Sequence, residues 1–224
     1  MDNDSADTVS LDSTIVLDLF TDRIVAEYTG RQDYVDDSNE ITRKLCLFYN
    51  ATLLYENNKK SVFGYFQKMH SLHLLADTPQ YLKDKQIIKV AGSYGNTSKG
   101  VNSTLPIINY GLDLLRDWLL KPVETQIQEG NEIQTQVTQN LYFLKGRAML
   151  QELIYYNPFN NYDRVSALIM LMIYREQFLI MYEGDVSSGN QRRREDDPGY
   201  AGNDEFFRKN FNDRFAGKLK DFGD

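Results

Sequence analysis

A short apolar run that ends in a carboxylate constrains the fold of this chain more than any other feature. Residues 51–54 read Ala-Thr-Leu-Leu, and Tyr55, Glu56 and two asparagines follow directly. An apolar run of this length between polar residues predicts a buried β-strand. A charged side chain at the carboxyl end of a strand lies at the edge where open sheets bind ligands. Glu56 is therefore the first candidate functional residue.

The residues before this run carry the patterns of a hairpin and a helix. Runs 15–20 and 24–29 are rich in β-formers, and the turn-forming residues between them predict an antiparallel hairpin. Asp37 with Glu40 three residues later resembles a capping box, and apolar side chains then recur at helical spacing as far as Asn50. We expect a hairpin followed by an amphipathic helix.

The residues after the run continue the alternation of helix and strand. Helical spacing over 60–69 is followed by a short apolar run at 72–76, which predicts a second strand. The order hairpin, helix, strand, helix, strand is typical of a mixed α/β fold with at least one right-handed parallel crossover. Residues 83–106 then form a long lysine- and glycine-rich loop that lacks the order of a phosphate loop.

The second half of the chain is predicted to be mainly helical. Helical spacing marks residues 108–119 and 149–154, and a nearly all-apolar helical pattern follows Asp163, which predicts a buried helix. Residues 124–139 are polar and are interpreted as a linker or an exposed helix. Residues 141–143 are interpreted as a short strand.

Composition predicts one globular domain with polar ends. Hydrophobic residues make up 42% of the 224 residues, which is ample for a core. Residues 1–10 are acidic and predicted to be flexible, 11–182 form the domain, and 183–224 are a charged tail predicted to be disordered. No stretch of the sequence approaches the roughly 18 uncharged apolar residues that a membrane span needs. The acidic amino terminus does not have the pattern of a signal peptide. With a single cysteine, which excludes an intrachain disulfide, these features favour a cytoplasmic protein.

Two carboxylates far apart in the sequence are the candidates for metal-dependent chemistry. Two-metal phosphodiester hydrolysis needs carboxylates on separate rigid elements, holding hard cations roughly 3.5–4 Å apart. Glu56 at a strand end and Asp163 at a helix start are of the right chemical type. The alternatives are a solvated acid at position 56 and an ordinary helix-capping aspartate at position 163. His70 and His73 lack a second ligand pair and are not interpreted as a metal site.

The net charge of −7 argues against binding nucleic acid by bulk electrostatics. Local lysines can still contact phosphates, and Lys59 and Lys60, directly after Glu56, and Lys99 are the candidates. The alternative for each of them is an ordinary solvated surface lysine.

Several short motifs follow one another along the chain. They are 24–31 (IVAEYTGR), 49–58 (YNATLLYENN), 74–79 (LLADTP), Lys99-Gly100 and 161–168 (NYDRVSAL). In this order they resemble the carboxyl-terminal nuclease domain of the large terminase subunit of tailed bacteriophages. The resemblance covers roughly residues 10–180, and the series of motifs is more specific than any one of them.

The resemblance implies a ribonuclease-H-like mixed sheet flanked by helices and a two-metal site that holds Mg²⁺ or Mn²⁺. Glu56 would be the middle metal-binding carboxylate and Asp163 the last one. The family's first catalytic aspartate lies on a central strand that precedes the hairpin, and this first central strand is missing here. Asp4 matches an auxiliary acid of some relatives. We therefore expect the chain to be completed by a terminase ATPase portion or another upstream polypeptide.

The implied activity is cleavage of concatemeric viral DNA during head filling. The implied partners are double-stranded DNA and a portal protein, and the implied location is the host cell cytoplasm, with no membrane partner. One alternative is a non-catalytic DNA-binding or assembly module of the same fold. Another is a resolvase-like or transposase-like nuclease with other partners.

Overall fold

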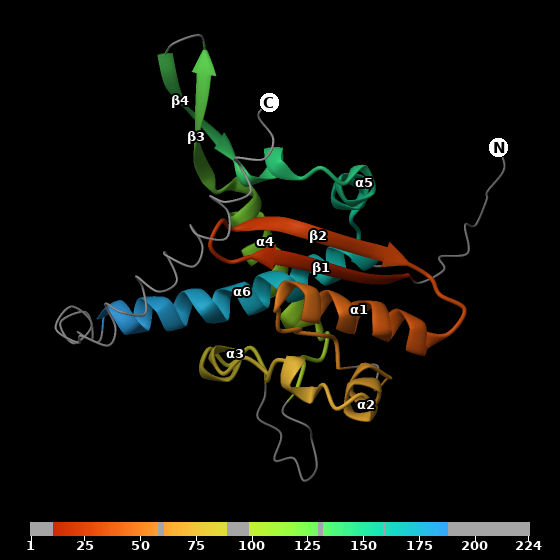
Figure 1. Ribbon diagram of the computed structural model, residues 1–224. Coiled ribbons are helices and arrows are strands. Elements are labelled where there is room, and N and C mark those ends of the chain that lie inside the picture. Colours follow the sequence, from red (N-terminus) through yellow and green to blue (C-terminus); the bar gives the residue numbers. More distant parts are fainter. Residues whose placement is uncertain (1–10, 58–60, 89–98, 130–131, 159, 188–224) are drawn as a thin grey trace, which may run out of the picture. The chain divides into compact units, whose positions relative to one another are not determined.

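The computed structural model describes residues 11–57, 61–88, 99–129, 132–158 and 160–187, and the fold is mixed α/β (Figure 1). The chain divides into two units after Gln177, and the described part of the second unit is the end of the last helix. The predictions of a flexible amino terminus and of a disordered tail beyond residue 187 lie outside the described residues. Residues 183–187, predicted as tail, continue the last helix.

In chain order the described elements are β1 (Asp12–Asp18), β2 (Arg23–Gly30), α1 (Val35–Tyr49), α2 (Ser61–Lys68), the 3₁₀ turn η1 (Leu72–Leu74), α3 (Tyr81–Asp84), α4 (Leu105–Leu120), β3 (Pro122–Glu129), β4 (Glu132–Gln139), the 3₁₀ turn η2 (Asn140–Phe143), α5 (Arg147–Tyr155) and α6 (Asp163–Ser187).

The predicted first hairpin and the helix after it are confirmed. β1 pairs antiparallel with β2, from Asp12 opposite Gly30 to Asp18 opposite Arg23. The capping box at the start of α1 is wrong, because the helix begins after Tyr34 without a side-chain cap. The Glu40 carboxylate instead accepts hydrogen bonds from Arg43 and from the Tyr65 hydroxyl of α2.

The two predicted strands, at 51–54 and 72–76, are not strands but take part only in isolated bridges. Leu53 bridges Leu75 in parallel and Glu56 bridges Val101 in parallel, while residues 72–74 turn as η1. The extended segment 53–57 thus pairs first with residues 74–76 and then with Val101. Each partner forms a single bridge with this segment, which is too short for a continuous ladder. The apolar patterns therefore predicted burial correctly but not the length of the strands.

The stretch interpreted as a linker or exposed helix is a second antiparallel hairpin. β3 pairs with β4 from Pro122 opposite Gln139 to Glu129 opposite Glu132. Valine, threonine and isoleucine recur at every second position in both strands, for example at Val123 and Thr125, which is the spacing of β-structure. The glutamines between them hid this period. Residues 141–143, predicted as a strand, lie in η2.

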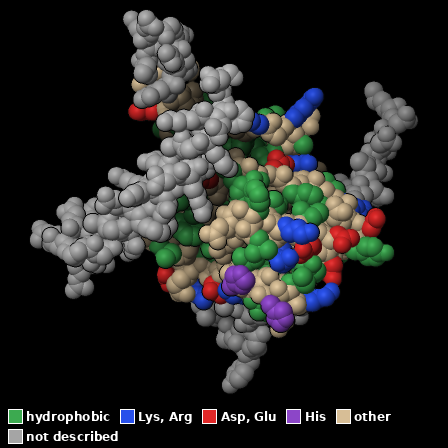
Figure 2. All heavy atoms as spheres, in the orientation of Figure 1, with side chains coloured by type: hydrophobic (Ala, Val, Ile, Leu, Met, Phe, Trp, Pro, Cys, Tyr) green, Lys and Arg blue, Asp and Glu red, His purple; other side chains and the backbone are tan. Residues whose placement is uncertain are grey.

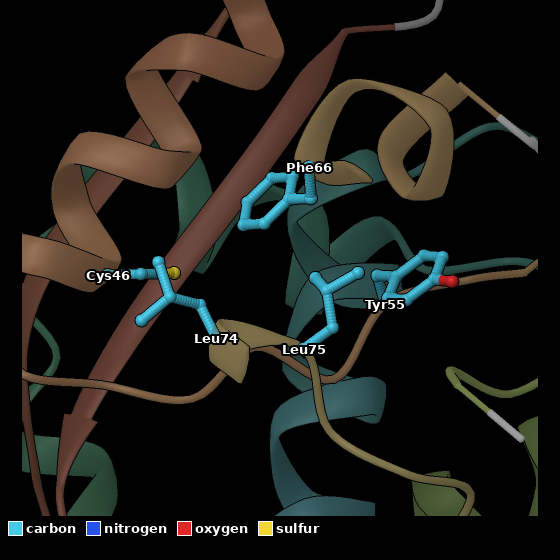
Figure 3. Close-up of a cluster of buried hydrophobic side chains, with 5 residues drawn as sticks. All are labelled: Cys46, Tyr55, Phe66, Leu74 and Leu75. Carbon is cyan, nitrogen blue, oxygen red and sulfur yellow. The ribbon is translucent and has the colours of Figure 1, made fainter. Parts of the chain in front are cut away.

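The core is built around the first half of α6, as its apolar pattern predicts. Val165, Leu168 and Ile173 are completely buried, and the Tyr81 hydroxyl donates to the Ile173 carbonyl oxygen at 2.8 Å. A second cluster lies between α1, α2, η1 and the extended segment (Figure 3). It consists of Cys46, Tyr55, Phe66, Leu74 and Leu75.

Asp22, in the turn between β1 and β2, connects the first hairpin to the helices. Its two carboxylate oxygens accept hydrogen bonds from Arg175 of α6 at 2.6 and 2.7 Å. The Trp118 indole donates to the same carboxylate at 3.1 Å, and the Lys121 ammonium donates at 2.8 Å. Burial alone would raise the pKa of Asp22, but the hydrogen bonds and charges of Arg175 and Lys121 lower it to about 2.

Replacing Asp22 with asparagine tests this connection. Asn fits the same volume and tolerates the positive φ of 56° at this position, so the turn itself is preserved. Loss of the charged bonds should lower the free energy of unfolding by about 2 kcal/mol, with the half-exposed Lys121 adding little. Urea unfolding measures the change. An equally stable Asp22→Asn protein would contradict the assignment.

The difference in the free energy of unfolding between wild type and Asp22→Asn should depend on pH. The pKa of Asp22 falls from 3.8 to about 2 on folding, so its stabilisation is present above about pH 4 and is lost as the pH approaches 2. The difference between wild type and Asp22→Asn should therefore be largest near neutral pH and should shrink in acid.

The close approach of α4 to α6 at Gly111 gives a second prediction. A Cβ atom at Gly111 would lie 2.5 Å from Cγ2 of Ile169 and 3.2 Å from Cδ1 of Ile173. Gly111→Ala should destabilise the protein by about 1–3 kcal/mol through overpacking. Gly64→Ala in α2, where a Cβ meets nothing within 4 Å, is the matched control and should stabilise by about 0.5–1 kcal/mol. Thermal unfolding of both variants compares them, and a loss of stability in both would point to backbone effects instead.

Candidate functional site

Glu56 and Asp163, separated by more than a hundred residues in the sequence, line the same cavity. Its volume is about 380 Å³. Residues 11–15 at the start of β1 and residues 52–56 form two of its walls, and residues of α1 and α6, together with Val62 of α2 and Asn161, complete the lining. The structure therefore places both acids that were singled out from the sequence in the wall of one cavity.

Glu56 is held by a parallel bridge to Val101. The Val101 amide donates to the Tyr55 carbonyl oxygen at 2.9 Å, and the Asn57 amide donates to the Val101 carbonyl oxygen at 2.9 Å. Gly100 adopts a φ of +76°, and a Cβ there would lie 2.8 Å from the Tyr55 carbonyl oxygen. Glycine is required at this point because no other side chain fits so close to the backbone. The bridge positions the half-buried Glu56 side chain at the cavity.

Asp163, the first residue of α6, binds the backbone at the start of β1. Its Oδ2 accepts the Leu11 amide at 2.7 Å and the Asn161 side-chain amide at 3.2 Å. The first amides of α6 have another acceptor, since the Glu152 carboxylate of α5 binds the Arg164 amide at 2.9 Å and the Val165 amide at 3.4 Å. Asp163 thus has a role that an ordinary capping aspartate does not, because it ties β1 to α6.

Arg164 reinforces the position of its neighbour Asp163. Its guanidinium pairs with Glu152 at 2.6 Å and with Glu27 of β2 at 2.9 Å. This group of charges joins β2, α5 and α6 next to the cavity. The helix start that carries Asp163 is therefore tied by ion pairs to α5 and β2.

A third acid, Asp12, also lines the cavity and was not singled out from the sequence. Asp12 could have been found from the sequence, because it lies at the start of the first predicted hairpin. Within the described ranges, no group of three histidine, cysteine, aspartate or glutamate side chains is close enough to hold an ion. Asp4, the proposed auxiliary metal ligand, lies outside those ranges.

Two buried polar side chains at the cavity were also missed. Ser38 and Asn39 of α1 are 4% and 6% exposed, and both line the cavity. The Ser38 Oγ and the Asn39 Nδ2 atoms have no hydrogen-bond partner among the residues that the structure describes. Next to them, the Thr42 and Thr14 hydroxyls are bonded to each other at 2.8 Å. In the sequence these polar residues lie at the predicted start of a helix, and nothing in the local pattern indicates that they are buried.

Lys99 is engaged within the protein. Its ammonium group lies 3.2 Å from an Asp77 carboxylate oxygen and donates to the Leu75 carbonyl oxygen at 2.8 Å. The side chain is 24% exposed. Lys99 thus fastens the start of the 99–101 segment to the segment after η1. Lys59 and Lys60, the other proposed DNA contacts, lie outside the described residues.

His70 and His73, which were not interpreted as metal ligands, are exposed on the surface (Figure 2). They follow α2 and lie in η1, and neither lines the cavity. On the face that Figure 2 shows, basic, acidic and hydrophobic side chains are interspersed.

Comparison of the chain with protein-family models, with curated proteins and with solved structures finds no match. Among the described helices, none has both the length and the apolar character needed to cross a membrane.

The bond between Asp163 and Leu11 can be tested by substitution. Asp163→Ala removes the acceptor, so hydrogen exchange at the Leu11 amide should accelerate about tenfold. Asp163→Asn keeps a side-chain oxygen that can accept the same hydrogen bond and serves as the matched control. Exchange measured residue by residue distinguishes the two. Unchanged exchange in the alanine variant would show that the amide is protected by something else.

Proposed function

We propose that this chain carries the nuclease portion of a phage DNA-packaging terminase and cuts double-stranded DNA in a metal-dependent reaction. The single observation that supports the proposal best is that Glu56 and Asp163, from distant elements, line one cavity. The order of the described elements is compatible with a ribonuclease-H-like topology. In that topology, a further strand would lie between β1 and residues 52–56.

The described residues supply two of the carboxylates that the proposed Mg²⁺ or Mn²⁺ site needs. Carboxylate oxygens are the ligands that these hard cations prefer, and Glu56 and Asp163 supply two such groups. A third carboxylate would come from outside the described residues, either from Asp4 or from an upstream polypeptide. A bound ion of this kind lowers the pKa of water and stabilises charge on phosphate oxygens.

The chain's own residues would position the substrate and the ligands. Glu56, fixed by the Val101 bridge, and Asp163, fixed by the Leu11 amide, would hold their carboxylates on two separate rigid elements. Lys59 and Lys60 would contact backbone phosphates, without reading bases. Lys99 is the weaker candidate for such a contact because its ammonium group already binds Asp77 and Leu75.

The partners follow from the same proposal. A nuclease of this class would act beside a terminase ATPase portion and a portal protein in the host cell cytoplasm. A resolvase-like nuclease of the same fold would have neither partner, so capture of the portal protein by this chain separates the two.

A non-catalytic DNA-binding or assembly module is the second candidate. It is favoured by one observation, that the described residues hold no third acid close enough to complete an ion site. Such a module would retain DNA whether or not the two carboxylates are intact.

Plasmid nicking in Mg²⁺ or Mn²⁺ is the decisive experiment. Glu56→Gln and Asp163→Asn should each reduce the rate by more than the roughly 10–100-fold typical of an outer-shell loss, because each removes a ligand charge. Asp113→Asn is the matched control, since this exposed acid lies on α4 and does not line the cavity, and it should cleave at the wild-type rate. DNA retention without cleavage, unaffected by either cavity variant, would replace the nuclease with the binding module.

A further inference from the structure

The second hairpin, formed by β3 and β4, has two strand edges that no described strand covers (Figure 1). The two strands pair only with each other among the strands that the structure describes, and their register is continuous from Pro122 opposite Gln139 to Glu129 opposite Glu132. An exposed strand edge presents unpaired backbone groups and is a template for pairing with another chain.

β4 is also uncovered on both of its faces. Four consecutive residues, 134–137, are exposed, and the Val137 side chain is among the exposed large hydrophobic ones at 63%. Consecutive side chains of a strand point to opposite faces, so neither face of this part of β4 is buried by residues that the structure describes. A two-stranded hairpin in water is at best marginally stable, whereas a larger sheet is stable. This hairpin would therefore be stabilised by a further strand.

The backbone groups of alternate β4 residues point to the open edge. The Gln136 carbonyl oxygen accepts a hydrogen bond from the Thr125 hydroxyl of β3 at 3.1 Å, so this carbonyl points toward β3. Along an antiparallel strand, successive residues direct their backbone groups to opposite sides. The amides and carbonyls of Ile133, Thr135 and Val137 therefore point away from β3. A further strand would form its hydrogen bonds with these groups.

The three residues whose backbone groups point outward are β-branched, but their cross-strand neighbours within the hairpin are polar. Ile133 lies opposite Gln128, Thr135 opposite Gln126, and Val137 opposite Glu124. Packing between cross-strand neighbours stabilises a sheet, and pairs of threonines add hydrogen bonds. A strand with β-branched residues at the three facing positions would form the pairs that β3 does not form.

A second copy of β4 has this pattern when it runs in the opposite direction. If Thr135 lies opposite Thr135 of the second copy, Val137 of each copy lies opposite Ile133 of the other. All of these residues direct their backbone groups to the edge, as hydrogen-bonded antiparallel pairs require. Glu132, the single acid of β4, then faces Thr138 and meets no like charge. The edge is therefore self-complementary about a two-fold axis at Thr135.

The free edge of β3 is less suited to a partner. Pro122 has no amide hydrogen, and Glu124 places a charge along this edge. Proline and charged residues are two means by which natural sheets protect exposed edges from pairing. Residues 133–138 of β4 contain neither. Of the two edges, that of β4 is the unprotected one.

We propose that two copies of this chain associate through the β4 edge, with the two β4 strands antiparallel and paired about Thr135. The two hairpins would then form one continuous four-stranded sheet. The partner is a second copy because one register satisfies the direction of the backbone groups, the pairing of β-branched residues and the separation of like charges. This association goes beyond the proposed nuclease activity and does not depend on it.

Charge substitutions at Thr135 in the full chain test the proposal. Sedimentation velocity over a range of protein concentrations measures the dissociation constant of the dimer. Thr135→Lys and Thr135→Glu each place two like charges directly opposite, and each should weaken the dimer at least about tenfold. An equal mixture of the two variants should restore association, because lysine then lies opposite glutamate. This complementation is expected of a residue that faces its own counterpart.

Thr125→Lys and Thr125→Glu, in the middle of β3, are the matched controls. Thr125 lies opposite Gln136 within the hairpin and away from the open edge of β4, so both variants should dimerise as wild type does. A wild-type chain that stays monomeric overturns the proposal, and so does a dimer that neither Thr135 variant weakens. Weakening by the Thr125 variants alone overturns it in favour of the β3 edge. Two monomeric Thr135 variants that do not associate when mixed overturn the pairing about Thr135.

Discussion

β1 is held at its two ends to one helix, and the cavity depends on this arrangement. At the start, the Leu11 amide binds Asp163, and beyond the other end Asp22 binds Arg175. The acceptor Asp163 and the donor Arg175 both belong to α6 and lie twelve positions apart along the helix. These two contacts tie the first hairpin to α6, and among the described strands β1 pairs with β2 alone.

The same arrangement explains why two acids that are distant in the sequence line one cavity. α6 carries Asp163 at its first turn, and the extended segment carries Glu56 close to its end. Charged groups beside a cavity are costly unless their surroundings hold them, and here the Arg164 network and the Gly100 turn do so. The position of each acid is thus a consequence of packing on elements that the sequence patterns locate well.

Sequence reasoning located the first hairpin, α1, α2, α4, α5 and the start of α6, because each has a strong apolar period. It also selected Glu56 and Asp163 by their places at element ends. It failed where tertiary pairing decides the outcome. Nothing local distinguishes a strand from one bridge at Leu53, and the polar glutamines of β3 and β4 concealed their alternation. The bond from Asp163 to Leu11 spans 152 positions, so no local pattern announces it. Whether the sheet is ribonuclease-H-like stays a prediction.

Cys46 has a practical consequence for studying the cavity. Its thiol is 4% exposed within the cluster of Figure 3, and burial raises its pKa to about 11. A thiol that is shielded and protonated near neutral pH reacts slowly with maleimides and similar reagents. Engineered surface cysteines can therefore be labelled selectively while the native residue stays in place. Pairs of spin labels on β1 and beside residues 52–56 would then report the distance across the cavity in solution.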